Sequence, residues 1–60
     1  MVTRNNFRKG SKFIVISGSE KNYRGIVKEK LSSDYFEGIL EGPRGGKLKR
    51  FYDISDVRFL

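Results

Sequence analysis

Residues 9–27 read KGSKFIVISGSEKNYRGIV, and this stretch decides the fold. The apolar run 13–16 is rich in β-branched residues and too short for a typical helix, so it predicts a strand. Small and polar residues over 17–23 predict a turn region. Alternation of apolar and polar side chains returns over 24–31, which predicts a second strand. The stretch is therefore expected to form two strands joined by a polar loop.

Three further short strands are predicted, over 35–41, 47–52 and 57–60. Segment 42–46 contains proline and glycines and is the clearest turn, while 53–56 has the length of one turn of 3₁₀ helix. Five short strands with turns every ~8–12 residues, and no sustained helical periodicity, are typical of a small all-β domain. A single helical turn before the last strand suits a five-stranded SH3-like barrel.

The strand faces predict the core. Glu29 falls on the apolar face of the second strand, so that strand is expected to bulge or to leave the core there. Gly38, in the middle of the third strand, allows a sharp bend. Asp53 and Asp56 are expected to cap the helical turn. The predicted core is Phe13, Val15, Val27, Phe36, Leu40, Phe51, Ile54, Val57 and Phe59.

Length and composition narrow the class of protein. Sixty residues make one domain with a small core. Residues 1–9 are interpreted as a loose basic N-terminal tail, which leaves 10–60 as the domain. There is no cysteine and no histidine, which excludes disulfides, zinc sites and catalysis by Ser/His/Asp or Cys/His groups. No cofactor and no metal are expected, and the chain is predicted not to be an enzyme.

Charge and hydropathy indicate where the chain acts. Thirteen Lys and Arg against seven Asp and Glu give a net charge of +6, which favours a polyanionic partner such as nucleic acid. The alternative is a soluble domain that carries extra lysines. No apolar run reaches the ~18–20 residues that cross a membrane, and the N-terminus has no apolar signal core. A cytoplasmic monomer without a membrane partner is predicted.

The stretch from Gly10 to Val27 resembles a KOW motif, the short hairpin of several ribosomal proteins and NusG-type transcription elongation factors. Ser19, Asn22 and Tyr23 depart from the family pattern, although Asn22 can still adopt a left-handed conformation. The residues that fall in register are Gly10, Lys12, the run 13–16, Gly18, Lys21, Arg24, Gly25 and Val27, of which Gly25 is the most characteristic.

The resemblance implies a fold and a contact site. KOW motifs lie in five-stranded SH3-like barrels, and the strands predicted after residue 27 fit such a barrel. In that family the hairpin loop contacts RNA, DNA or a protein partner. By resemblance, Lys21, Tyr23 and Arg24 are therefore candidates for contact.

The cations form three groups along the chain. Lys47 and Lys49 share one strand face by period two, and Lys28 and Lys30 share another, so a curled sheet can join them into one basic surface. The alternative is that these are solvated strand exteriors that deter edge pairing. The groups are Arg8, Lys9 and Lys12; Lys21 and Arg24; and Arg44, Lys47, Lys49 and Arg50.

Aromatic and acidic residues complete the candidate site. Unpaired bases stack on exposed aromatic rings, and Tyr23, Tyr35 and Tyr52 are the candidates. Tyr23 is expected to be exposed, whereas Tyr52 fits a contact residue and a core residue equally well. Glu37 and Glu41 share a face and raise the alternative of paired carboxylate chemistry. They are interpreted as a solubilising face opposite the basic one.

The sequence thus predicts a non-enzymatic module that binds RNA or DNA with low sequence specificity, as an accessory factor in transcription or translation. The alternative is a protein-interaction module that docks on RNA polymerase, the ribosome or another partner through the same loop and Tyr35, Ile39 and Tyr52. An aromatic-cage reader of the Tudor type has less support. The predicted nucleic-acid contacts are Lys12, Lys21, Tyr23, Arg24, Arg44, Lys47, Lys49, Arg50 and Tyr52.

Overall fold

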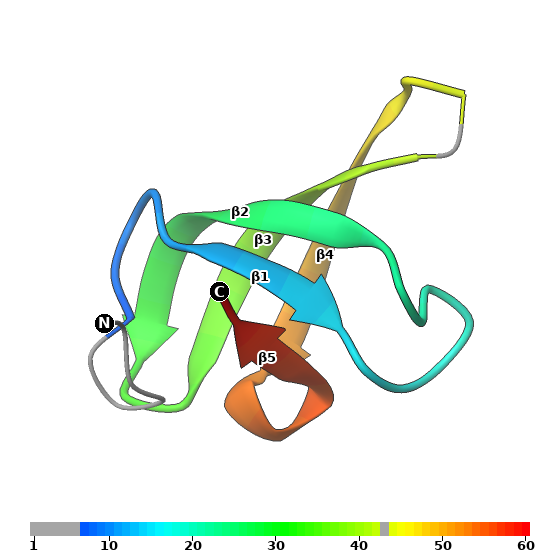
Figure 1. Cartoon of the computed structure of the whole chain (residues 1–60). Helices are drawn as coiled ribbons and strands as arrows, with labels where there is room; N and C mark the ends of the chain where they lie inside the picture. Colours follow the sequence, from blue (N-terminus) through cyan, green and yellow to red (C-terminus); the bar gives the residue numbers. More distant parts are fainter. Residues whose placement is uncertain (1–6, 43) are drawn as a thin grey trace.

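The computed structural model describes residues 7–42 and 44–60 (Figure 1). The regular secondary structure of these residues is β-strand, with one turn of 3₁₀ helix. None of these residues belongs to a helix long and apolar enough to cross a membrane. The elements in chain order are β1 (Lys12–Val15), β2 (Arg24–Ser32), β3 (Tyr35–Glu41), β4 (Lys47–Asp53), η2 (Ile54–Asp56) and β5 (Val57–Phe59).

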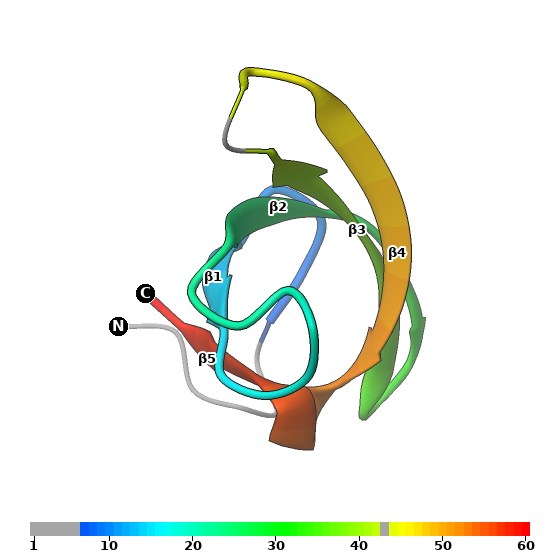
Figure 2. The ribbon, with the colours of Figure 1, turned by 90° about the vertical axis from the view of Figure 1, so that its right-hand side faces the viewer.

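The five strands form one antiparallel sheet in the order β4-β3-β2-β1-β5. The sheet is curled, and η2 carries the chain from β4 at one edge to β5 at the other (Figure 2). No strand pairing closes β4 onto β5 in the described part of the chain, so the sheet stays open. The predicted all-β class, the five strands and the helical turn before the last strand are confirmed.

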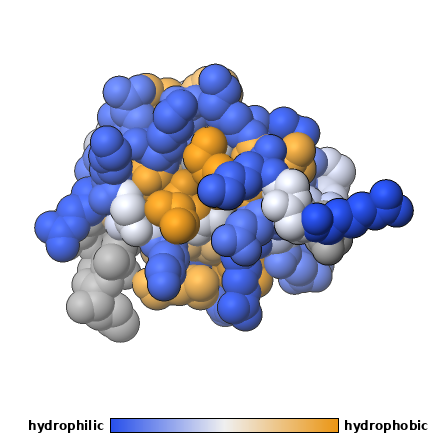
Figure 3. Space-filling view, turned by 90° about the horizontal axis from the view of Figure 1, so that it is seen from above, coloured by the Kyte–Doolittle hydropathy of each residue, from blue (hydrophilic) through white to orange (hydrophobic). Residues whose placement is uncertain are grey.

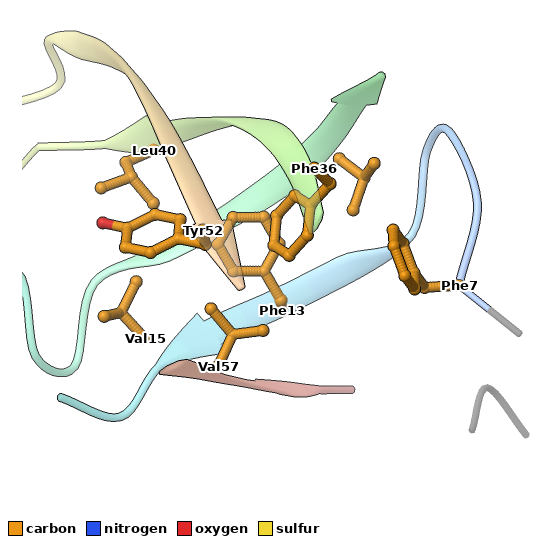
Figure 4. Close-up of a cluster of buried hydrophobic side chains, with 8 residues drawn as sticks. Phe7, Phe13, Val15, Phe36, Leu40, Tyr52 and Val57 are labelled. Atoms are coloured by element: carbon orange, nitrogen blue, oxygen red, sulfur yellow. The ribbon is translucent and has the colours of Figure 1, made fainter. Parts of the chain in front are cut away.

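The core lies on the concave face of the curled sheet, where aromatic rings from different strands meet (Figure 4). Phe13 is fully buried, and its ring meets the rings of Phe36 and Tyr52 at centroid distances of 5.1 and 6.0 Å. Ile54 and Phe59 are partly buried against this cluster. The other predicted core residues that are confirmed as buried are Val15, Val27, Leu40 and Val57.

The predicted burial of Phe51 is wrong. Phe51 is 52% exposed, whereas its neighbour Tyr52 is buried. Successive side chains of a strand point to opposite faces, so only one of the two can reach the core. Tyr52 is the inward one because β4 pairs it with the buried Phe36.

Phe7 corrects the interpretation of the N-terminal segment. The sequence places it in a loose tail, but its side chain is only 1% exposed and the centre of its ring lies 5.0 Å from that of Phe59. The segment is tied to the sheet just after it, where the Gly10 amide donates to the Val27 carbonyl at 2.8 Å. The rest of the predicted tail, residues 1–6, lies outside the described residues.

Local irregularities follow two of the sequence signals. The β2–β3 register shifts between Val27 and Glu29, which confirms the predicted bulge. Asp53 caps η2 as predicted, because its Oδ1 accepts a hydrogen bond from the Ser55 amide at 2.9 Å. Asp56 instead accepts a hydrogen bond from the Ser17 hydroxyl.

Candidate functional site

The convex face of the sheet carries most of the strand cations. Phe13 and Val15 point into the core, so the alternate positions of β1 point outward, and the same rule holds on the other strands. Six lysine and arginine side chains lie at such outward strand positions, and all six are exposed. We call this surface the cationic face, and its basic residues are Lys12, Arg24, Lys28, Lys47, Lys49 and Arg58.

An apolar hollow of about 290 Å³ lies within the cationic face. The register places its floor, because Ile26 pairs with Lys12 on one side and with Ile39 on the other. Figure 3 shows apolar surface surrounded by hydrophilic side chains on the side of the molecule seen from above. Lys12, Arg24 and Lys47 line the hollow together with Ile26, Ile39 and Leu60, and Glu41 adds one carboxylate.

Glu37 lies among these cations, not on a face opposite them. The Lys49 ammonium is 3.5 Å from its carboxylate, and the Lys28 ammonium is 3.9 Å from the same oxygen. Glu37 is 8% exposed. The interpretation of Glu37 as part of a separate solubilising face is therefore wrong, and this carboxylate neutralises part of the surface that a polyanion would approach.

The loop between β1 and β2 lies across the concave side of the sheet (Figure 2). Tyr23, expected to be exposed, is partly buried against the core. Asn22 has a φ of 77°, so the expected left-handed conformation is confirmed. The Tyr52 hydroxyl donates to a Glu20 carboxylate oxygen at 3.0 Å, which attaches the loop to β4. Lys21 remains exposed on this loop, away from the strand positions that form the cationic face.

The predicted site residues therefore separate into two sets. Four of them belong to the cationic face, namely Lys12, Arg24, Lys47 and Lys49. Arg50 alternates to the other side of β4, Arg44 is exposed in the β3–β4 turn, and Tyr52 is in the core. The predicted pairing of Lys28 with Lys30 fails, because the register shift between Val27 and Glu29 pairs Lys30 with the inward-facing Phe36, and the Lys30 ammonium lies 4.5 Å from the centre of the Phe7 ring.

Sequence reasoning missed Arg58, Ile26 and Leu60. Arg58 joins the cationic face only because β5 pairs with β1, which places it opposite Ile14. Ile26 is 46% exposed and Leu60 is 55% exposed. Ile26 and Lys28 are two residues apart on one strand, so the period-two alternation of β2 carries the signal that places Ile26 on this face.

Two aromatic rings stand together on the same convex face. The Tyr35 and Phe51 rings are parallel to within 8°, and their centroids are 6.2 Å apart. Both belong to neighbouring strands, and both are more exposed than any other aromatic ring among the described residues. Phe51 pairs with Glu37 across the strands, so the ring pair borders the cationic face.

The contact between the loop and β4 shifts two pKa values. Hydrogen bonds from the Ser19 and Tyr52 hydroxyls lower the pKa of Glu20. Burial, helped by the hydrogen bond to Glu20, raises the pKa of Tyr52 from 10.0 to about 12. The Tyr52 phenol is therefore held protonated in the folded chain, as the donor of this hydrogen bond.

Alkaline unfolding is expected to report this contact. Between pH 10 and about 12 the folded chain keeps the Tyr52 proton while the unfolded chain loses it, so the free energy of unfolding falls as pH rises through this range. Urea unfolding at several pH values measures the slope, and phenolate absorbance measures the titration. The Tyr52→Phe variant is expected to show a shallower slope over that range. An identical slope in both proteins would contradict the assignment.

The described residues contain no cluster of three or more His, Cys, Asp or Glu side chains that could hold a metal ion. The site that remains is the cationic face with its apolar hollow and its aromatic border. Comparison of the chain with protein-family models, with curated proteins and with solved structures gives no match.

Proposed function

We propose that this chain is a non-enzymatic module that binds nucleic acid through the cationic face. The observation that carries the proposal is the convergence of Lys12, Arg24 and Lys47, from three different strands, around one hollow. Cations that approach one surface together can neutralise successive phosphates and release their counterions. The net charge of +6 favours the same class of partner.

Contacts of this kind carry little sequence information. Lysine and arginine contacts to phosphate oxygens fix position on the backbone and do not read base edges. Low sequence specificity is therefore part of the proposal. The resemblance of residues 10–27 to a KOW motif supports a role as an accessory factor in transcription or translation, in the cytoplasm.

Salt-dependent binding tests the cationic face. The Lys47→Ala/Lys49→Ala variant is expected to show a smaller salt dependence of binding. The slope of the logarithm of the association constant against the logarithm of the salt concentration should fall in magnitude by about 1.4 to 1.8, because each lost phosphate contact contributes about 0.7 to 0.9. Fluorescence anisotropy with labelled DNA and RNA strands, from ~50 to ~200 mM salt, measures the slope. No binding by the unmodified chain at ~50 mM salt would contradict the proposal.

A matched control separates this face from net charge. The Lys21→Ala/Arg50→Ala variant loses the same charge from the loop and from the other side of β4, so its slope is expected to stay close to that of the unmodified chain. Glu37→Gln is expected to act in the opposite direction and to tighten binding by about two- to tenfold, since it frees Lys28 and Lys49 from an ion pair. If the Lys21→Ala/Arg50→Ala variant lost more of the salt slope than the variant without Lys47 and Lys49, the ligand would lie on the loop and not on the cationic face.

The exposed apolar hollow favours one alternative, a protein-docking module. Ile26 and Leu60 are about half exposed, and cations around an apolar centre also suit an acidic protein partner. Ribosomal subunits and RNA polymerase are the first partners to test by co-sedimentation. In that case Ile26→Ser is expected to abolish association, whereas nucleic-acid binding through phosphates would tolerate this change.

A further inference from the structure

The Tyr35 and Phe51 rings form a feature of the convex face that phosphate binding does not use. Each ring belongs to an outward position of an adjacent strand, and the two rings are nearly parallel. Tyr35 is 41% exposed and Phe51 is 52% exposed. Two nearly parallel, partly exposed aromatic rings are therefore available to a ligand on this face.

Positive charge lies directly beside this surface. Lys49 precedes Phe51 by two residues on the same face of β4, about 6.6 Å along the strand. The Lys49 and Lys28 ammonium groups both reach Glu37, the residue paired with Phe51. A ligand strand whose phosphates contact these two lysines would thus place its neighbouring base on the two rings.

We propose that the ligand is a single-stranded nucleic acid, and that one unpaired base stacks on the Tyr35–Phe51 pair while the phosphates lie along Lys49 and Lys28. This inference rests on the proposed function and specifies its ligand. An unpaired base exposes both of its faces, whereas bases inside a duplex are already stacked on their neighbours. Stacking on an aromatic ring tolerates any base, in keeping with low sequence specificity.

The aromatic contribution is measured by comparing strands with duplexes. The probes are labelled oligo-dT and oligo-U of about 12 nucleotides and a DNA duplex of the same length. Phe51→Leu and Tyr35→Leu are each expected to weaken single-strand binding by about 5- to 150-fold, with little effect on the duplex and no change in salt slope. The two single-stranded probes distinguish RNA from DNA as the preferred source of the base.

Control variants keep the test independent of folding. Phe51→Trp is expected to retain affinity, and because the chain has no other tryptophan, base stacking is expected to quench its fluorescence. Ile16→Ala removes apolar surface that is also about half exposed, but from the residue that follows β1, which β2 separates from the strands of the two rings, and is expected to leave binding unchanged. Circular dichroism checks that each variant is folded.

The outcomes separate this inference from the proposed function. If strands and duplexes bind with the expected salt slope but Phe51→Leu and Tyr35→Leu weaken neither, or weaken both equally, base stacking is overturned and phosphate binding stands. If the tryptophan of Phe51→Trp is not quenched by bound strands, stacking is again overturned. If no nucleic acid binds at ~50 mM salt, the proposed function itself fails.

Discussion

Replacing Gly25 by alanine is expected to destabilise the folded chain by about 1–3 kcal/mol or more. An added Cβ would lie 2.5 Å from the Ile39 carbonyl oxygen and 2.8 Å from Cζ of Phe13. The first contact is with backbone, which cannot retreat without disturbing the β2–β3 pairing of Ile26 with Ile39. Overpacking costs about 1–3 kcal/mol and sometimes more, against a stability of about 3–9 kcal/mol for a domain of this size.

Urea unfolding followed by circular dichroism measures this effect. Gly46→Ala is the matched control, because no atom lies within 4 Å of an added Cβ there and the backbone has no positive φ. The control is expected to be neutral or slightly stabilising, by up to about 1 kcal/mol. Equal unfolding midpoints for the two variants would show that the space beside Gly25 is not needed. Gly25 is also the glycine most characteristic of the resemblance to a KOW motif.

Phe7→Ala is expected to destabilise the chain by about 3–5 kcal/mol, the usual cost of deleting a buried phenylalanine side chain. The Phe7 ring lies 5.3 Å from that of Phe36 and 5.0 Å from that of Phe59, and Lys30 places its ammonium over the ring face. The segment before the first strand would then be an integral part of the fold, and its removal would open one end of the core.

The same substitution at an exposed position provides the control. Phe51→Ala removes an identical side chain from the convex face and is expected to cost no more than about 1 kcal/mol, the range of strand preferences. Thermal or urea unfolding of the two variants gives the comparison directly. A loss at Phe7 no larger than that at Phe51 would restore the interpretation of the segment as a loose tail.

Strand positions were predictable because β-branched runs and turn residues are local signals. The extent of β3, the one-turn helix and its Asp53 cap, and the bulge near Glu29 all follow from residues adjacent in sequence. The choice between Phe51 and Tyr52 is not local, since it depends on which of them β4 sets opposite Phe36. Phe7 gave no periodic signal at all, because its neighbours in sequence are polar.

The candidate site was only partly predictable for the same reason. Period two is sufficient to group Lys47 with Lys49 and to separate Arg50 from them, a distinction that a cluster along the sequence obscures. Bringing Lys12, Arg24 and Lys47 together requires the order of strands in the sheet. The position of Glu37 between two lysines is not a local signal either, because Lys28 comes from β2 and Lys49 from β4, while the bulge of β2 turns Lys30 toward Phe7 instead.

The open edge of the sheet has a consequence for local stability. β4 has a strand partner on one side only in the described part of the chain, whereas β1 and β2 are paired on both sides. Opening β4 therefore breaks fewer backbone hydrogen bonds, and its amides belong to the part of the sheet that opens at low free energy. A polyanion that spans Lys49 on β4 and Lys12 on β1 ties this edge to the centre, so part of its binding energy is spent on making the sheet more rigid.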